Sequence, residues 1–95
     1  MNKSELKALT ILRNAEHPLQ PRDIVAYSKS EVAEGVKHTP ITFEELYKAL
    51  QTLEKKEHVI SMKYERTGLG LMRRYYKITQ LGREAWSVHM LGVKR

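Results

Sequence analysis

The sequence predicts a mainly α-helical domain that carries one small β-hairpin, a fold of the α+β class. Three observations predict it. Three amphipathic segments occupy the first 56 residues, two segments of alternating character then flank a glycine-containing turn, and one further amphipathic segment follows. The order helix, helix, helix, hairpin, helix is that of a winged helix-turn-helix, in which the hairpin is the wing. At 95 residues, the chain is expected to form a single domain over residues 1–95, without a second core.

The first helix is predicted over Ser4–Ala15, with Ser4 as its N-cap. Leu6, Leu9 and Leu12 recur at three-residue steps, as the buried side of a helix requires. Alanine and isoleucine residues widen this apolar arc beyond what one core contact needs. We therefore expect Leu6 and Leu9 to face a second subunit as well.

The second helix is predicted to start at Pro21, because proline is preset for the first helical turn. Ile24, Val25 and Tyr27 are its expected buried side. The helical pattern then fades, and a loop that contains Gly35 is expected before the third helix.

The third helix has the clearest signals. Thr42 followed by Glu45 is a capping box, and Leu46, Leu50 and Leu53 form one apolar stripe. The opposite face is polar: it carries Glu44, Lys48, Gln51 and Lys55, with Tyr47 and Thr52 on its flanks. Glutamine and lysine read base edges in the major groove, and hydroxyl groups bind phosphates. An ordinary solvated helix face remains the alternative interpretation.

The hairpin is predicted from two strands, His58–Glu65 and Met72–Thr79, around a turn that contains Arg66. Because side chains alternate along a strand, Arg74 shares a face with Tyr76 and Ile78, which we expect to be the core side. Arg73 and Lys77 then point outward. We expect Arg66, at the tip, to enter a minor groove. A third strand at Leu19, paired along the hairpin edge, is a further possibility.

Charge is concentrated in the second part of the chain. The net charge is +6, and residues 57–95 hold eight lysine and arginine residues against three acidic ones. A polyanion is the natural partner of such a surface, and nucleic acid is the commonest. Arg73 and Arg74 pairing with Glu57 or Glu65 is the alternative, but three acids cannot neutralise eight cations.

The last helix, residues 79–92, carries two apolar stripes, and Thr79 is its expected cap. Leu81, Ala85 and Val88 fall on one side, and Trp86 and Met90 on another. We expect one side to pack on the domain and the Trp86–Met90 side to contact a second subunit. A tryptophan folded back onto the first helix is the alternative.

Several classes of function are excluded. The absence of cysteine rules out disulfides, thiol nucleophiles and thiolate metal sites. No apolar run has the length of a membrane span, and the charged N-terminal segment lacks the apolar core of a signal peptide. The histidines are scattered, without metal or catalytic spacing. We expect no enzyme, catalytic residue, metal or cofactor, and a cytoplasmic, nucleoid-associated location.

Two segments give a resemblance to a known family. LYKALQTLEKK at 46–56 and RRYYKITQLGR at 73–83 resemble the recognition helix and wing strand of PadR-type winged-helix proteins. The resemblance covers about residues 5–92. It implies a dimeric transcriptional regulator that binds palindromic double-stranded DNA and packs its C-terminal helix on its partner. It also implies groove or phosphate contacts from Thr42, Tyr47, Lys48 and Gln51, and wing contacts from Arg66, Arg73 and Lys77.

The sequence thus predicts a sequence-specific DNA-binding homodimer that recognises an inverted repeat. The loop before the third helix departs from the family pattern, and the short last helix predicts no ligand pocket. Two alternatives stay open. One is a DNA-organising protein, as in plasmid partition, that assembles further along DNA. The other is a winged helix used only for protein–protein assembly.

Overall fold

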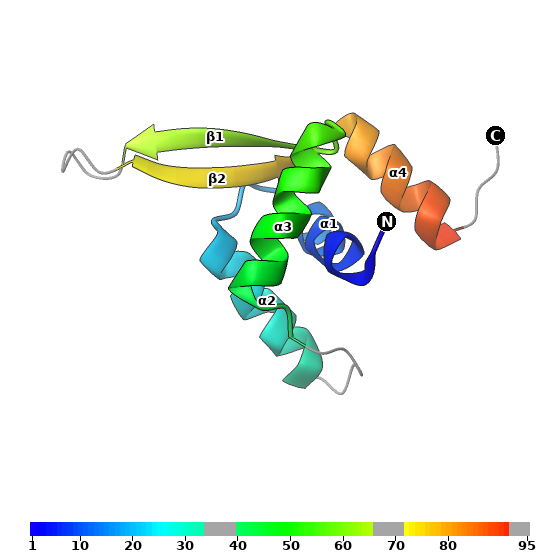
Figure 1. Cartoon of the computed structure of the whole chain (residues 1–95), viewed down its shortest axis with the longest axis horizontal. Coiled ribbons are helices and arrows are strands. Elements are labelled where there is room, and N and C mark those ends of the chain that lie inside the picture. Colours follow the sequence, from blue (N-terminus) through cyan, green and yellow to red (C-terminus); the bar gives the residue numbers. More distant parts are fainter. Residues whose placement is uncertain (34–39, 66–71, 92–95) are drawn as a thin grey trace.

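The computed structural model describes residues 1–33, 40–65 and 72–91, and it confirms the predicted order of elements (Figure 1). The helices are α1 (Lys3–Ala15), α2 (Pro21–Ala33), α3 (Phe43–Lys55) and α4 (Gln80–Leu91), and the strands are β1 (Val59–Glu65) and β2 (Met72–Ile78). The loop at Gly35 and the tip at Arg66 lie outside the described residues. Of the helices described, none is both long and apolar enough to pass through a bilayer.

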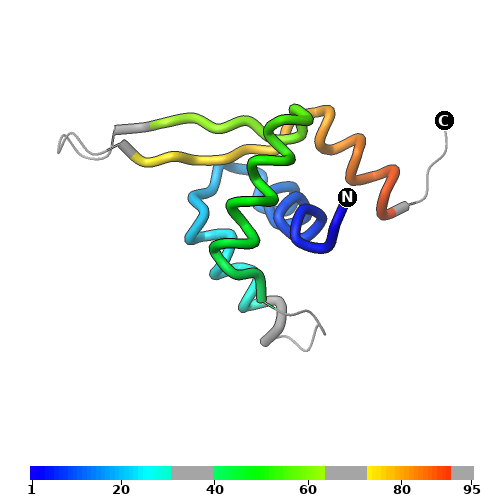
Figure 2. Tube along the Cα trace, viewed as in Figure 1, coloured from blue at the N-terminus to red at the C-terminus, as the bar shows by residue number. Residues whose placement is uncertain are grey.

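The core lies between the first three helices and the base of the hairpin. The hairpin extends from one side of this helical body and α4 from the other, so the two ends of the molecule carry different elements (Figures 1 and 2). The second predicted leucine stripe is buried here with residues of α2 and β1, and so are Leu9 and Leu12 of the first stripe, whereas Leu6 is partly exposed. The largest side chains with almost no exposed surface are Leu9, Leu12, Ile24, Leu46, Leu50, Leu53 and Val59.

Helix α1 begins earlier than predicted, because Asn2 and not Ser4 is its N-cap. The Asn2 side chain accepts a hydrogen bond from the backbone N–H of Glu5 at 2.8 Å. Asparagine and serine are equally good caps, so composition alone could not choose between them. The Ser4 hydroxyl instead donates to Glu45 of α3 at 3.5 Å.

The connection into α2 contacts the hairpin at one point. Leu19 and Tyr76 exchange two backbone hydrogen bonds of 2.9 and 2.8 Å, as an isolated bridge. The third strand considered from the sequence is therefore a single residue pair among the described residues. Helix α2 starts at Pro21 as predicted, but Tyr27 is 47% exposed and so does not belong to its buried side. Ile24, Val25 and the fully buried Ser28 form that side instead.

Helix α3 is held at its start by the predicted capping box. The Thr42 hydroxyl accepts from the backbone N–H of Glu45 at 3.2 Å, and the Glu45 carboxylate accepts from the Thr42 N–H, also at 3.2 Å. Ile41 and Leu46, before the cap and one turn after it, are both buried in the core. This arrangement is a hydrophobic staple, which sets the angle at which the chain enters the helix.

The hairpin is antiparallel, and its register places Val59 opposite Ile78 and Lys63 opposite Arg74. Tyr76 and Ile78 are buried, which confirms the predicted core side of β2. Because directly opposite residues share a face, Lys63 and Arg74 lie on the same face as the core residues. They are nevertheless exposed, since they lie farther along the hairpin than the buried pairs.

Helix α4 is positioned by its first turn. Thr79 is its cap, since its hydroxyl accepts from the backbone N–H of Gly82 at 2.9 Å. Gly82 lies so close to β1 that an added Cβ would overlap the carbonyl oxygen of His58. Glycine is required here because only a residue without a side chain lets the helix approach the strand backbone.

Candidate nucleic-acid interface

The polar face of α3 is exposed, as the sequence predicts. Tyr47 is 49% exposed, and the side chains of Lys48, Gln51 and Lys55 are also exposed. The opposite face is buried through Leu46, Ala49, Leu50 and Leu53. The helix therefore presents amide, ammonium and hydroxyl groups outward from a rigid base.

Glu44 and Lys48 form an ion pair on this face, one helical turn apart. The Lys48 Nζ lies 3.6 Å from Glu44 Oε1, and about four fifths of each side chain is exposed, at 76% and 81%. An exposed pair of this kind contributes only about 0.3–0.5 kcal/mol. Either group is thus easily released, Lys48 to a guanine or phosphate and Glu44 to a cytosine amino group.

The family resemblance implies that Thr42 contacts the groove or a phosphate, but its hydroxyl is already engaged in hydrogen bonds with Glu45. Its hydroxyl donates to Glu45 Oε1 at 2.9 Å while it accepts from the Glu45 N–H. This hydrogen bond is the main reason why the pKa of the Glu45 carboxyl lies below its usual value. A phosphate oxygen is only an acceptor, so to bind it the Thr42 hydroxyl would have to redirect its O–H from Glu45 Oε1, although the two hydrogen bonds of the capping box could remain.

Phe43 is an exposed aromatic residue beside this face that the sequence analysis did not select. Its ring is 47% exposed and stacks against Tyr47, with ring centroids 6.3 Å apart and planes inclined by 30°. Helical spacing places Phe43 seven residues before Leu50, on the edge of the core stripe. The sequence therefore suggests core packing, and its position in the first turn is what leaves it exposed.

The hairpin places its cations on both faces. Arg73 and Lys77 lie outward as predicted, and Arg74 is exposed on the inner face opposite Lys63. Lys63 was not among the predicted contacts, and only the strand register reveals its pairing with Arg74. Arg66, the predicted minor-groove residue, lies outside the described residues.

Among the side chains that the structure describes, which do not include that of Glu65, the hairpin cations have no acidic partners. The ion pairs found there join Glu44 to Lys48 and Glu5 to Lys56, and neither includes Arg73, Arg74 or Lys77. Pairing of the two arginines with Glu57 is therefore not seen. Lys63 and Arg74 are like charges directly opposite each other, an arrangement that destabilises a hairpin unless an anion lies between them.

Trp86 packs against the domain and not outward. Its Nε1–H donates to the Thr10 hydroxyl of α1 at 2.8 Å, and the Arg13 guanidinium lies 4.0 Å from the ring centroid. The alternative left open by the sequence, a tryptophan folded back onto the first helix, is the one the structure has. Met90, the other member of the predicted patch, is 49% exposed.

The side of α4 that was expected to pack on the domain is also exposed. Leu81 and Val88 are 46% and 47% exposed, and with Ala85 they border a groove of about 410 Å³ between α4 and Lys56. Of the α1 residues predicted to face a partner, Leu6 is partly exposed, whereas Leu9 has no exposed surface that a partner would contact.

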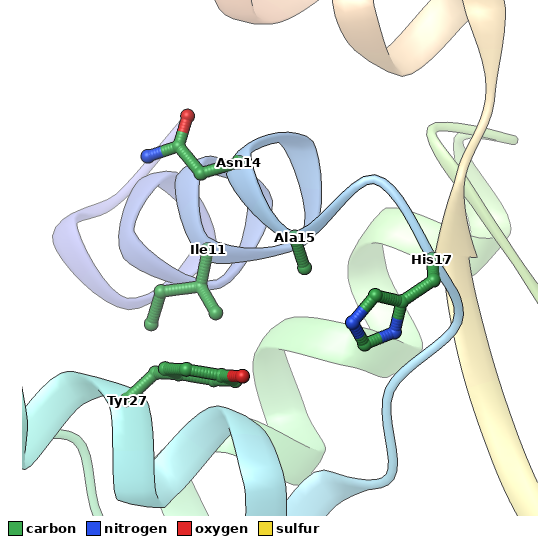
Figure 3. Close-up of a pocket in the computed structure, with 5 residues that line it drawn as sticks. All are labelled: Ile11, Asn14, Ala15, His17 and Tyr27. Atoms are coloured by element: carbon green, nitrogen blue, oxygen red, sulfur yellow. The ribbon is translucent and has the colours of Figure 1, made fainter.

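An open cavity of about 300 Å³ lies between α1 and α2 (Figure 3). Ile11 and Ala15 point toward the ring of Tyr27, and His17 stands at one end. The described residues hold no cluster of three acidic or histidine side chains placed to bind a metal. The described residues that line the cavity include the imidazole of His17 and the phenol of Tyr27 but no carboxylate.

Comparison with known proteins identifies the fold. No protein-family model and no curated protein sequence matches the chain. Among solved structures, Bacillus subtilis PadR in complex with operator DNA is similar over the whole chain, with a TM-score of 0.77 and 20% identity. A PadR family transcription regulator from hypervirulent Clostridium difficile R20291 covers 96% of the chain with a TM-score of 0.72 and 19% identity. A transcriptional regulator from Clostridium thermocellum covers 93%, with a TM-score of 0.70 and 25% identity.

The shares of those structures that the chain covers differ. The chain spans about half, 49%, of Bacillus subtilis PadR, but 86% and 79% of the other two proteins. The predicted resemblance to PadR-type winged-helix proteins is confirmed at the level of the fold. The two Clostridium proteins are described as transcription regulators, and Bacillus subtilis PadR was solved in complex with operator DNA.

Proposed function

We propose that this chain, which has the fold of PadR-family regulators, is a transcriptional regulator that binds double-stranded DNA sequence-specifically as a homodimer. The observation that carries the proposal is the set of exposed hairpin cations, which have no acidic partner among the described side chains, beside an exposed polar helix face. The neighbour solved with operator DNA supports the same class of ligand.

In this proposal α3 enters the major groove and the hairpin binds the backbone. Gln51 and Lys48 present an amide and an ammonium group to base edges, and Tyr47 presents a hydroxyl to phosphate. A phosphate between Lys63 and Arg74 would relieve the repulsion that their register imposes. Base discrimination is thus assigned to the helix and salt-dependent affinity to the hairpin.

The first experiment is selection of bound sequences from random duplex DNA at low and at high salt. We expect an enriched inverted repeat with half-sites about 34 Å, or one helical turn, apart. Salt-sensitive binding without enrichment would contradict sequence recognition and favour a DNA-organising protein. Absence of binding at both salt concentrations would contradict the DNA-binding function and favour protein–protein assembly.

The hairpin contacts are tested with Arg73→Ala. Loss of one phosphate contact should weaken binding to all sequences and reduce the slope of log affinity against log salt by about one unit. Lys3→Ala is the control, because this exposed lysine at the start of α1 lies outside the proposed interface. An unchanged slope for Arg73→Ala would remove Arg73 from the phosphate contacts.

The helix contacts are tested with Gln51→Ala. The change should lower affinity for the selected site by about 5- to 100-fold while affinity for random DNA stays the same, since a good base contact is worth about 1–3 kcal/mol. Equal losses on both kinds of DNA would show that Gln51 does not read a base.

We further propose that a second copy of the chain covers the exposed stripe of α4. A two-fold site in DNA requires a two-fold protein, and Leu81, Ala85 and Val88 are the apolar side that the domain itself leaves uncovered. Met90 is also exposed but lies on the Trp86 side of α4, whereas Leu9 and Trp86 pack within the domain.

The dimer is tested by sedimentation of Leu81→Glu combined with Val88→Glu, which should be monomeric and folded. Ile60→Glu is a matched control, because Ile60 is an equally exposed apolar residue, at 48%, on the hairpin. A double variant that remains dimeric would place the interface elsewhere.

The length of the DNA footprint, measured at increasing protein concentration, separates a simple regulator from a DNA-organising protein. A simple regulator has a footprint of fixed length, and a DNA-organising protein has one that grows.

A further inference from the structure

Phe43 is a large apolar residue left half exposed at the start of α3, beside the exposed polar face of that helix. It is the first residue of α3, and 47% of its surface is exposed. Immediately before it Thr42 caps the helix, and immediately after it Glu44 pairs with Lys48. The cap at Thr42 therefore fixes the backbone at Phe43, whereas the half-exposed ring of Phe43 is not part of the hydrophobic core.

The ring has a defined direction because Tyr47 supports it. Phe43 and Tyr47 are one turn apart, and their rings stack at a centroid distance of 6.3 Å. Glu54 lies on the same flank of α3, two turns after Tyr47, and its carboxylate accepts a hydrogen bond of 2.7 Å from Ser61 of β1. The aromatic pair thus lies along the flank of α3 that faces the hairpin.

The chemistry of a major groove limits what such a ring can contact. A phenyl ring neither donates nor accepts a hydrogen bond, and the only apolar group on the base edges in that groove is the 5-methyl group of thymine. The N-terminal residues of a recognition helix are the ones that reach base edges. Phe43 is the first of these residues here.

We propose that Phe43 is a specificity-determining residue that contacts the 5-methyl group of one thymine in each half-site, with Tyr47 holding its ring in place. This inference rests on the proposed DNA-binding function. In this proposal one helix makes two kinds of contact with the bases. Gln51 and Lys48 form hydrogen bonds with base edges, and Phe43 makes an apolar contact with a methyl group.

The test replaces each thymine of the selected site by deoxyuridine, which removes one methyl group and leaves every hydrogen bond of the base pair. For the unchanged protein, affinity should fall about fourfold at one thymine of each half-site, the loss expected for one methyl-sized group removed from contact. Phe43→Ala should bind the thymine site more weakly and should be insensitive to deoxyuridine at that same position. Tyr47→Phe, which keeps both rings, should retain the sensitivity.

The outcomes separate this inference from the function on which it rests. If the unchanged protein and Phe43→Ala lose the same affinity at every deoxyuridine position, Phe43 does not read a methyl group, although the sequence-specific function stands. If no sequence is selected at all, the proposed function fails and this inference fails with it. Thermal unfolding of Phe43→Ala provides the control for folding, and its midpoint should stay close to that of the unchanged chain because the ring is half exposed.

Discussion

Helices α3 and α4 have almost the same length, 13 and 12 residues, but divide their surfaces in different ways. Helix α3 buries one leucine stripe completely and leaves a polar face outward. Helix α4 has two apolar sides and packs the first part of one of them against the domain, through Gly82 and Trp86, while Leu81 and Val88 stay exposed. The first pattern leaves a helix free to bind a polar ligand, and the second leaves an apolar surface for another protein chain.

The difference shows what decides the orientation of a helix. For α3 the hydrophobic stripe alone is sufficient, because only one rotation about the helix axis buries it. For α4 two rotations bury comparable apolar area. The choice between them depends on polar and steric details, namely the hydrogen bond from Trp86 to Thr10 and the space that Gly82 leaves for the backbone of His58.

The largest effect is expected from Gly82→Ala, which disrupts the close packing of α4 against the backbone of His58. A methyl group at this position would overlap the His58 carbonyl oxygen and come within 2.9 Å of the Ile78 side chain. Overpacking of this kind costs about 1–3 kcal/mol, more than the roughly 1 kcal/mol that alanine gains over glycine in a helix.

Thermal unfolding of Gly82→Ala measures this cost. Each kcal/mol shifts the midpoint of a domain of this size by roughly 4–8 °C, so a clear decrease should be seen. Ser87→Ala, on the same helix, is the control and should change little. A Gly82→Ala chain more stable than the original would contradict the close approach of α4 to β1.

The next largest effect is expected from Trp86→Ala. The change removes a partly buried ring, its hydrogen bond to Thr10 and its contact with the Arg13 guanidinium. We expect a loss of about 2 kcal/mol in the free energy of unfolding, below the 3–5 kcal/mol of a fully buried tryptophan. Val88→Ala, on the exposed side, should cost less than about 0.5 kcal/mol at protein concentrations where the chain is monomeric.

Urea unfolding of these two variants sharpens the comparison within one helix. Equal losses would mean that the two sides of α4 are equivalent and that the assignment of its buried side is wrong. A double-mutant cycle of Trp86→Phe with Thr10→Val isolates the hydrogen bond, for which a coupling of about 1 kcal/mol is expected.

The sequence predicted the fold because its local signals agree with one another. The capping box at Thr42, the alternation in the hairpin and the start of α2 at Pro21 all follow from backbone chemistry within a few residues. The sequence could not predict which side of α4 is buried, because that choice depends on Thr10 and Arg13, more than 70 residues away along the chain.

The candidate site was predicted only in part, for a related reason. The polar residues of α3 follow from helical spacing, but Lys63 and Phe43 do not. Lys63 joins the site through its register with Arg74 across the hairpin, which depends on the pairing of the two strands. Phe43 has the spacing of a residue at the edge of the core, but its ring is half exposed and stacks on Tyr47.

A moderate effect is expected from Thr42→Ala, which tests the cap that orients α3. Loss of an N-cap hydroxyl costs about 1 kcal/mol, measured as the free energy of unfolding. Thr52→Ala is the matched control in the same helix, because the Thr52 hydroxyl only donates to the carbonyl of Lys48 and caps nothing. Similar losses for the two variants would mean that the capping box contributes no more than an interior hydroxyl.

The smallest effect concerns the pH dependence of the same cap. Hydrogen bonds from the hydroxyl and backbone N–H of Thr42 lower the pKa of Glu45, with further contributions from Ser4 and Lys7. A carboxyl group whose pKa is lower in the folded state stabilises the fold above its usual pKa, near 4.5, and loses this contribution as pH falls through the lowered value.

Glu45→Gln keeps an acceptor at the third helical position but does not titrate there. The free energy of unfolding of the original chain should therefore decrease more steeply below about pH 5 than that of Glu45→Gln, and Thr42→Ala should flatten the same part of the curve. Parallel curves for the original chain and Glu45→Gln would mean that the charge of Glu45 does not stabilise the start of α3. Substitutions on the two apolar faces of α4 should leave the pH dependence of the free energy of unfolding unchanged in either case.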